Sequence, residues 1–290
     1  MKKYFKDVDG LSIEFLESDG NSDPIFIFHG NSSGGGSYEP LLTSEIGKKY
    51  RFIAVSFPGH GNSTYYQDDD VISIAKLGKF THDVTHIFDA DRYIIVGQSL
   101  GGHALLESLH LHKNACGICL VSAPPFSLGT ISSAFLEDPT AGLLFKRDLN
   151  DDEIDRFAIA FLHHNTRENI QSLTSHIRNT RGVFRESLGA SLVSGIILDE
   201  VESLRLSSLP ALFMRGEHDR FINSNYYESL ATYIGPVNIV NFPDAGHAIN
   251  MDCPHLFAAT LDTFISDIFG RISWVKKSTS TADAELAYAE

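Results

Sequence analysis

The segment Gly97–Gly101 reads Gly-Gln-Ser-Leu-Gly and contains a serine that is suited to act as a nucleophile. It follows the apolar, β-prone residues Ile94–Val96 and precedes a helix-compatible segment, His103–Leu111. A Gly-x-Ser-x-Gly motif between a strand and a helix is typical of a sharp turn that exposes the serine hydroxyl at the carboxyl edge of a sheet. The pattern therefore predicts Ser99 as a nucleophile.

A serine hydroxyl reacts well only when a base removes its proton and an acid orients that base. His247 follows the strand-like run Asn238–Phe242, and Asp219 follows the apolar run Ala211–Met214. Because the carboxyl ends of parallel strands meet at one sheet edge, we expect Ser99, Asp219 and His247 to converge. Two further carboxylates near Asp219 and His247 in the sequence remain alternatives for the acid, namely Glu217 and Asp244.

The oxyanion that forms when the serine attacks a carbonyl needs preset N–H donors. The backbone N–H of Leu100, directly after the nucleophile, is one candidate. Asn31, in the glycine-rich segment His29–Gly36, is the second, through its backbone N–H or its side-chain amide. That segment lacks the Gly-x-x-x-x-Gly-Lys pattern of a phosphate-binding loop. We expect residues beside these donors to contact the substrate, namely Gly30, Ser32 and Gln98.

Short apolar runs alternate with helix-compatible segments along most of the chain, which predicts an α/β protein with a mostly parallel sheet covered on both faces. The interpretation gives strands at Leu11–Glu17, Pro24–Phe28, Phe52–Val55, Arg92–Val96, Gly117–Val121, Ala211–Met214 and Asn238–Phe242. It gives helices at Glu39–Ile46, Ser73–Phe88, Ser99–Leu111, Ser224–Tyr233 and Pro254–Ile268.

This alternation breaks between residues 124 and 206, where amphipathic helical stretches occur without a clear strand. We interpret residues 124–206 as a helical cap over a core of residues 1–123 and 207–272, followed by a flexible tail of residues 273–290. The cap is rich in aromatic residues, and we expect Phe126, Phe157 and Phe161 to line a pocket for an apolar acyl chain. Each ring could equally serve to pack the cap onto the core.

The composition excludes several classes of partner. The formal net charge of −14 over 290 residues argues against nucleic acid, which requires a clustered basic surface. No apolar run is long enough to span a bilayer, and the basic start lacks the apolar region of a signal peptide. Three cysteines are too few for a disulfide framework and fit a reducing cytoplasm. The 13 histidines show no metal-ligand spacing, so we expect neither a metal nor another cofactor.

With these motifs, the sequence resembles the α/β-hydrolase superfamily over nearly its whole ordered length. A narrower similarity, in His29–Ser33, Glu45–Lys49 and Pro58–Thr64, is to its metal-independent N-acyl-homoserine-lactone hydrolases. The resemblance implies an α/β-hydrolase fold, with an eight-stranded, mostly parallel sheet flanked by helices and a helical cap inserted after the sixth strand. It also implies opening of the lactone ring of a quorum-sensing signal, and therefore quorum quenching.

The sequence thus predicts a serine hydrolase (a carboxylic ester hydrolase) whose small-molecule substrate is an ester or lactone with an apolar acyl chain. A generic carboxylesterase and a carbon–carbon bond hydrolase of the same fold are alternatives. A ligand sensor with slow turnover is a further alternative from a different class, because a fold by itself does not define a function. The oligomeric state and the preferred acyl-chain length do not follow from the sequence.

Overall fold

A sheet of eight strands runs through the computed structural model, which describes the backbone of residues 1–67, 71–193, 198–234 and 238–286 and the side chains to residue 270, except that of residue 231. The spatial order is β1-β2-β4-β3-β5-β6-β7-β8. The β1–β2 and β2–β4 pairs are antiparallel, and all other neighbours are parallel. The strands are β1 (Lys2–Val8), β2 (Leu11–Glu17), β3 (Ile25–Phe28), β4 (Phe52–Val55), β5 (Tyr93–Gln98), β6 (Ala115–Val121), β7 (Ala211–Gly216) and β8 (Asn238–Phe242).

This sheet confirms the predicted eight-stranded, mostly parallel architecture, including the position of the long helical insertion after the sixth strand. The seven strands named from the sequence are all present. The eighth, β1, shows no apolar pattern because most of its side chains are exposed. It is an edge strand that is held by backbone pairing with β2 along its whole length.

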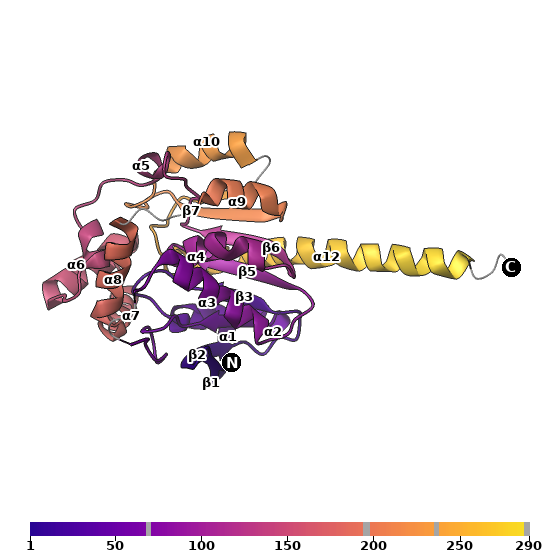
Figure 1. Cartoon of the computed structure of the whole chain (residues 1–290), viewed down its shortest axis with the longest axis horizontal. Coiled ribbons are helices and arrows are strands. Elements are labelled where there is room, and N and C mark those ends of the chain that lie inside the picture. The colour runs from indigo at the N-terminus through magenta and orange to yellow at the C-terminus, as the bar shows by residue number, and fades with distance from the viewer. Residues whose placement is uncertain (68–70, 194–197, 235–237, 287–290) are drawn as a thin grey trace.

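Helices cover both faces of the sheet. The side chains of each strand alternate between these faces, so each face has its own hydrophobic core. Phe26 and Phe28 of β3 pack into the core beneath α3 (Ile74–His86) and α4 (Leu100–Ser108), whereas Ile25 and Ile27 pack beneath α12 (Pro254–Leu286). Figure 1 shows α3 and α4 lying along the sheet, with α12 extending beyond it. The core helices are α1 (Glu39–Thr43), α2 (Glu45–Lys49), α3 (Ile74–His86), α4 (Leu100–Ser108), α9 (Glu200–Ser207), α10 (Ser224–Ile234), α11 (Ile249–Asp252) and α12 (Pro254–Leu286), with 3₁₀ turns η1 (Gly35–Tyr38) and η2 (Leu109–Leu111).

The insertion after β6 consists of helices, and among them α6 (Asp151–Phe161), α7 (Arg167–Asn179) and α8 (Gly182–Val193) lie together at one end of the sheet (Figure 1). The insertion also contains α5 (Ile131–Ala134) and η3 (Ala141–Phe145). Asn150 begins α6 with a capping box to Glu153, so the acidic first turn meets the positive end of the helix dipole. Helix α9 also lies between β6 and β7 in the chain, but it packs against α4 and α10 of the core. The domain boundaries and the flexible tail remain predictions.

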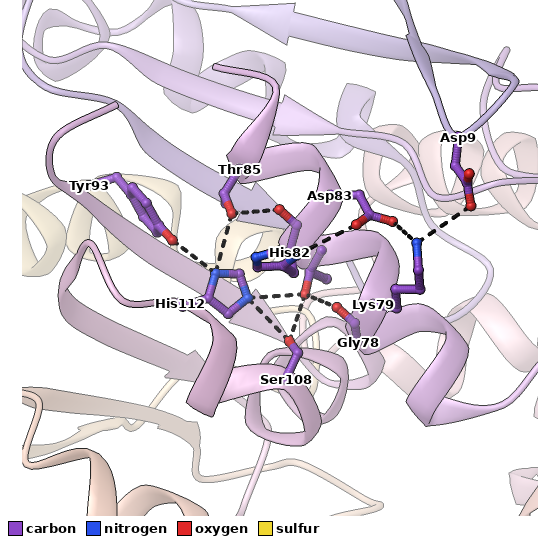
Figure 2. A network of polar contacts seen from close by, with 10 residues as sticks. Asp9, Gly78, Lys79, His82, Asp83, Thr85, Tyr93, Ser108 and His112 are labelled. Carbon is purple, nitrogen blue, oxygen red and sulfur yellow. Dashed lines mark hydrogen bonds and ion pairs between the residues drawn. The ribbon is translucent and has the colours of Figure 1, made fainter. Parts of the chain in front are cut away.

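Between α3, η2 and β5, the buried ring of His112 is surrounded by hydroxyl groups (Figure 2). Its Nδ1 lies 3.2 Å from the Tyr93 hydroxyl and 3.4 Å from that of Thr85. Its Nε2 lies 3.1 Å from the Ser108 hydroxyl and 3.3 Å from that of Thr81. Burial lowers the pKa of His112 to about 3, so a neutral ring joins these elements.

In the described residues, no helix combines the length and the hydropathy that crossing a bilayer requires.

Candidate active site

Ser99 lies in a strained turn between β5 and α4. Its backbone has φ 48° and ψ −119°, a conformation that non-glycine residues rarely adopt. A Cβ on Gly97 would lie 2.5 Å from Cα of Gly102, and one on Gly101 would lie 2.2 Å from the carbonyl oxygen of Phe28. Only glycine therefore fits at either flanking position. The turn leaves Ser99 partly exposed while its neighbours are buried.

His247 and Asp219 form a buried pair beside this turn. The distance from Nδ1 of His247 to Oδ2 of Asp219 is 2.8 Å, and both side chains are at most 4% exposed. The other carboxylate oxygen of Asp219 accepts hydrogen bonds from the backbone N–H groups of Phe221 (2.9 Å) and Ile222 (3.3 Å). Asp219 is thereby fixed as an acceptor that orients the imidazole.

The two alternative acids lie elsewhere. Glu217 is exposed and accepts a hydrogen bond from the side chain of Asn241, on the adjacent strand β8. Asp244 is also exposed. Of the three carboxylates considered from the sequence, Asp219 is the one that contacts His247.

Ser99 and His247 line the same two cavities. Within the described residues, the Ser99 hydroxyl forms no hydrogen bond, including none to His247. Catalytic hydrogen bonds are often long in ligand-free enzymes and shorten when substrate binds, so the arrangement is compatible with proton transfer.

The backbone N–H groups of Leu100 and Asn31, which line the same cavity as Ser99, have no hydrogen-bond partner in the described part of the chain. They are the two oxyanion donors expected from the sequence. The segment His29–Gly36, called the Asn31 loop below, approaches the serine closely: the position that a Cβ of Gly30 would occupy lies 3.3 Å from Cβ of Ser99.

The side-chain amide of Asn31 has other partners. Its Nδ2 donates to the carbonyl oxygen of Leu144 in η3 over 2.8 Å. Its Oδ1 accepts a hydrogen bond from the Ser32 hydroxyl over 3.0 Å. The amide thus joins the insertion to the core, which favours the backbone N–H over the side chain as the oxyanion donor.

Two fully buried histidines hold the Asn31 loop and were not predicted as part of the site. Nε2 of His60 accepts a hydrogen bond from the backbone N–H of Ser32 (3.3 Å). Nε2 of His29 accepts one from the N–H of Phe57 (3.0 Å). Burial lowers the pKa of His29 to about 3 and that of His60 well below its usual value, so both rings stay neutral and can accept. The loop sequence by itself gives no sign of this support.

Gln98 connects the nucleophile turn to the His247 loop. Its Oε1 accepts a hydrogen bond from the Tyr38 hydroxyl at 2.7 Å. Its Nε2 donates to the backbone carbonyl of His247 and to Oδ1 of Asn250, each at 3.4 Å. Ser122 donates to the same carbonyl at 3.0 Å. The sequence suggests a substrate contact for Gln98, and the structure adds a hydrogen-bond network that fixes the backbone at His247.

A larger cavity of about 330 Å³ and a smaller one of about 20 Å³ meet at Ser99. The larger cavity has a mostly apolar lining from the core and the insertion. The smaller one has room for about one water molecule. Among the residues expected to bind substrate, Phe126 lines the larger cavity, Phe161 lines both, and the others line the smaller one: Gly30, Ser32, Gln98 and Phe157.

Among the residues that the structure describes, no three His, Cys, Asp or Glu side chains are arranged to hold a metal ion.

Residues 25–260 match the family model described as the alpha/beta hydrolase family. The chain belongs to this family. Among solved structures, this hydrolase is similar to a variant of the N-acyl homoserine lactonase AidH with bound N-hexanoyl homoserine lactone. The TM-score is 0.83 at 24% identity, and the match covers 92% of this chain and 98% of that one.

Two further proteins show the breadth of the similarity. One is the structure of a putative aryl esterase from Burkholderia cenocepacia, with a TM-score of 0.80 and 17% identity over 93% of this chain and all of that one. The other is the sn-1-specific diacylglycerol lipase ABHD11 of Danio rerio, 20% identical over 88% of this chain and 82% of its own length. Membership of the family indicates a hydrolase. The similar proteins are named as lactonase, esterase and lipase.

Proposed function

We propose that this hydrolase cleaves an ester or lactone through a nucleophilic serine, with Ser99, His247 and Asp219 as catalytic residues. The observation that carries the proposal is the buried Asp219–His247 pair, with 2.8 Å between carboxylate and imidazole, beside a serine in a strained turn. A binding protein without turnover has no use for a general base so arranged.

In the proposed first step, Nε2 of His247 takes the hydroxyl proton of Ser99 as Oγ attacks the substrate carbonyl carbon. The carboxylate of Asp219 keeps the proton on Nδ1 and stabilises the imidazolium. The backbone N–H groups of Leu100 and Asn31 stabilise the negative oxygen. The ester C–O bond then breaks, and His247 returns its proton to the departing oxygen.

In the proposed second step, water hydrolyses the acyl-enzyme. His247 accepts a proton from the water molecule, whose oxygen attacks the acyl carbon, and the proton passes to Oγ of Ser99. The smaller cavity, which is lined by both residues, has the size that one such water needs. Each proton that His247 accepts is passed on, first to the departing oxygen and then to Oγ of Ser99, and no cofactor takes part in either step.

As substrate we propose an N-acyl homoserine lactone, with the ring carbonyl at Ser99 and the acyl chain in the larger cavity. Phe126 and Phe161 would contact that chain. The cavity volume of about 330 Å³ is at the lower end of small-molecule sites. Hydrolysis would quench the signal that such lactones carry.

Cys116, Cys119 and Cys253 are unpaired, which suits the reducing cytoplasm that we propose as the location of this hydrolase.

The test is to incubate purified protein with N-hexanoyl homoserine lactone and to follow the ring-opened acid by mass spectrometry. We expect conversion by the wild type and none above background by Ser99→Ala. Intact lactone beside rapid hydrolysis of a nitrophenyl ester would assign the protein as a generic carboxylesterase. Turnover of neither substrate, together with ligand-induced stabilisation, would support the ligand-sensor alternative.

A further inference from the structure

The larger cavity contains a polar side chain, that of His103, which the proposed mechanism does not use. Most of the lining is apolar, and the polar residues in it are Asn31, Ser99, His247 and His103. His103 lies on α4, four residues after Ser99, which corresponds to a rise of roughly 6 Å along the helix. Because Ser99 and His103 line the same cavity, we expect the first carbons of an acyl chain bound at Ser99 to pass close to His103.

His103 is held by a fully buried carboxylate. Its Nδ1 lies 3.1 Å and 3.0 Å from the two oxygens of Glu200, on α9, and Glu200 is 0% exposed. One of these oxygens also accepts a hydrogen bond from the backbone N–H of Phe126 at 3.1 Å. The imidazole packs against the rings of Phe126 and Phe135. The carboxylate and the two aromatic rings thus fix the orientation of the His103 imidazole.

The opposite nitrogen of this ring is available to a ligand. In the part of the chain that the structure describes, Nε2 of His103 has no hydrogen-bond partner, although the residue is only 7% exposed. Burial raises the pKa of Glu200, and in such an apolar setting a pair with no net charge is favoured. That pair shares one proton between Nδ1 and the carboxylate. A pair without net charge holds one more proton, which resides on Nε2 of His103. Nε2 therefore acts as a hydrogen-bond donor.

We infer that His103 is a specificity-determining residue: with Glu200 behind it, it donates a hydrogen bond to an oxygen on the acyl part of the substrate. The favoured substrates carry a keto, hydroxyl or amide oxygen a few carbons from the scissile carbonyl. A plain alkyl chain leaves the donor unpaired and is bound less well, because a buried polar group without a partner is costly. This inference rests on the proposed function, since it concerns the acyl pocket of that same site.

The test compares nitrophenyl hexanoate with nitrophenyl keto-hexanoates that carry the ketone at successive chain positions. We expect kcat/KM of the wild type to rise about tenfold for one position, which corresponds to about 1.4 kcal/mol. A matched pair of variants isolates the imidazole. Glu200→Gln keeps an acceptor for Phe126 and leaves a neutral His103 with Nε2–H, so the preference remains. The double variant His103→Phe/Glu200→Gln differs only at residue 103, leaves no buried charge, and loses the preference.

Two results would overturn the inference: equal rates for all chains with the wild type, or an unchanged preference in the double variant. If the double variant does not fold, equal rates for all chains with the wild type still overturn the inference. Failure of the proposed function looks different, because then no ester or lactone is hydrolysed at all. In that case calorimetric titration of the wild type with hexanoate and the corresponding keto-acids tests the donor directly. Equal affinities would reject it.

Discussion

Nδ1 of His247 lies 2.8 Å from Oδ2 of Asp219, and the other oxygen of that carboxylate is held by two backbone N–H groups. Asp219→Asn should therefore keep the shape of the loop but favour the wrong imidazole tautomer. We expect kcat on a nitrophenyl ester to fall about 10³- to 10⁴-fold, with little change in melting temperature. Glu217→Gln is the matched control, since this exposed carboxylate does not contact His247. Equal losses in both variants would contradict the assignment of the acid.

The φ of 48° at Ser99 indicates that the nucleophile is held under strain. Ser99→Ala and Ser99→Gly both remove the hydroxyl and should both be inactive. Glycine adopts this backbone conformation more easily than alanine, so Ser99→Gly should be the more stable by about 1 kcal/mol. Thermal or urea unfolding of the two variants measures the difference. A less stable glycine variant would show that the turn is relaxed.

Asn31 offers a test of which N–H stabilises the oxyanion. Its side-chain amide already bonds to Leu144, so Asn31→Ala removes a link to the insertion but keeps the backbone donor. We expect kcat to fall less than about tenfold. Loss of an oxyanion donor typically costs about 10²- to 10³-fold. A loss of that size would mean that the side chain itself reaches the oxyanion.

The buried histidines make stability dependent on pH. His29 and His112 have folded-state pKa values near 3, whereas an unfolded histidine has a pKa of about 6.5. Between these values the unfolded chain binds more protons than the folded chain. The free energy of unfolding therefore has its full value above about pH 6.5 and falls as the pH decreases toward 3. Each group contributes a slope of at most about 1.4 kcal/mol per pH unit.

Urea unfolding between pH 7 and pH 4 checks this dependence. His112→Gln should give a shallower fall with decreasing pH than the wild type, because one titrating group is removed. His164→Gln, at an exposed histidine, is the control and should follow the wild-type curve. An identical slope in His112→Gln would show that this histidine is not the group responsible.

Local patterns in the sequence were sufficient for most of the architecture. Buried strands such as β3 and β4 appear as continuous apolar runs because parallel strands are covered on both faces. The glycines around Ser99 and the order of Ser99, Asp219 and His247 pointed to the strand ends that meet. The edge strand β1 was not identified, since its mostly exposed side chains leave no apolar signal and pairing with β2 defines it.

Periodicity and turn chemistry are local properties, so the sequence was enough to predict which elements form and which residue types stand at their carboxyl ends. The choice among the three carboxylates required the three-dimensional structure, since the geometry that brings Asp219 to His247 depends on how two loops fold against each other. The same holds for Gln98, His60 and the His103–Glu200 pair. Each joins segments that are distant along the chain, and side-chain hydrogen bonds of this kind leave no periodic trace in a sequence.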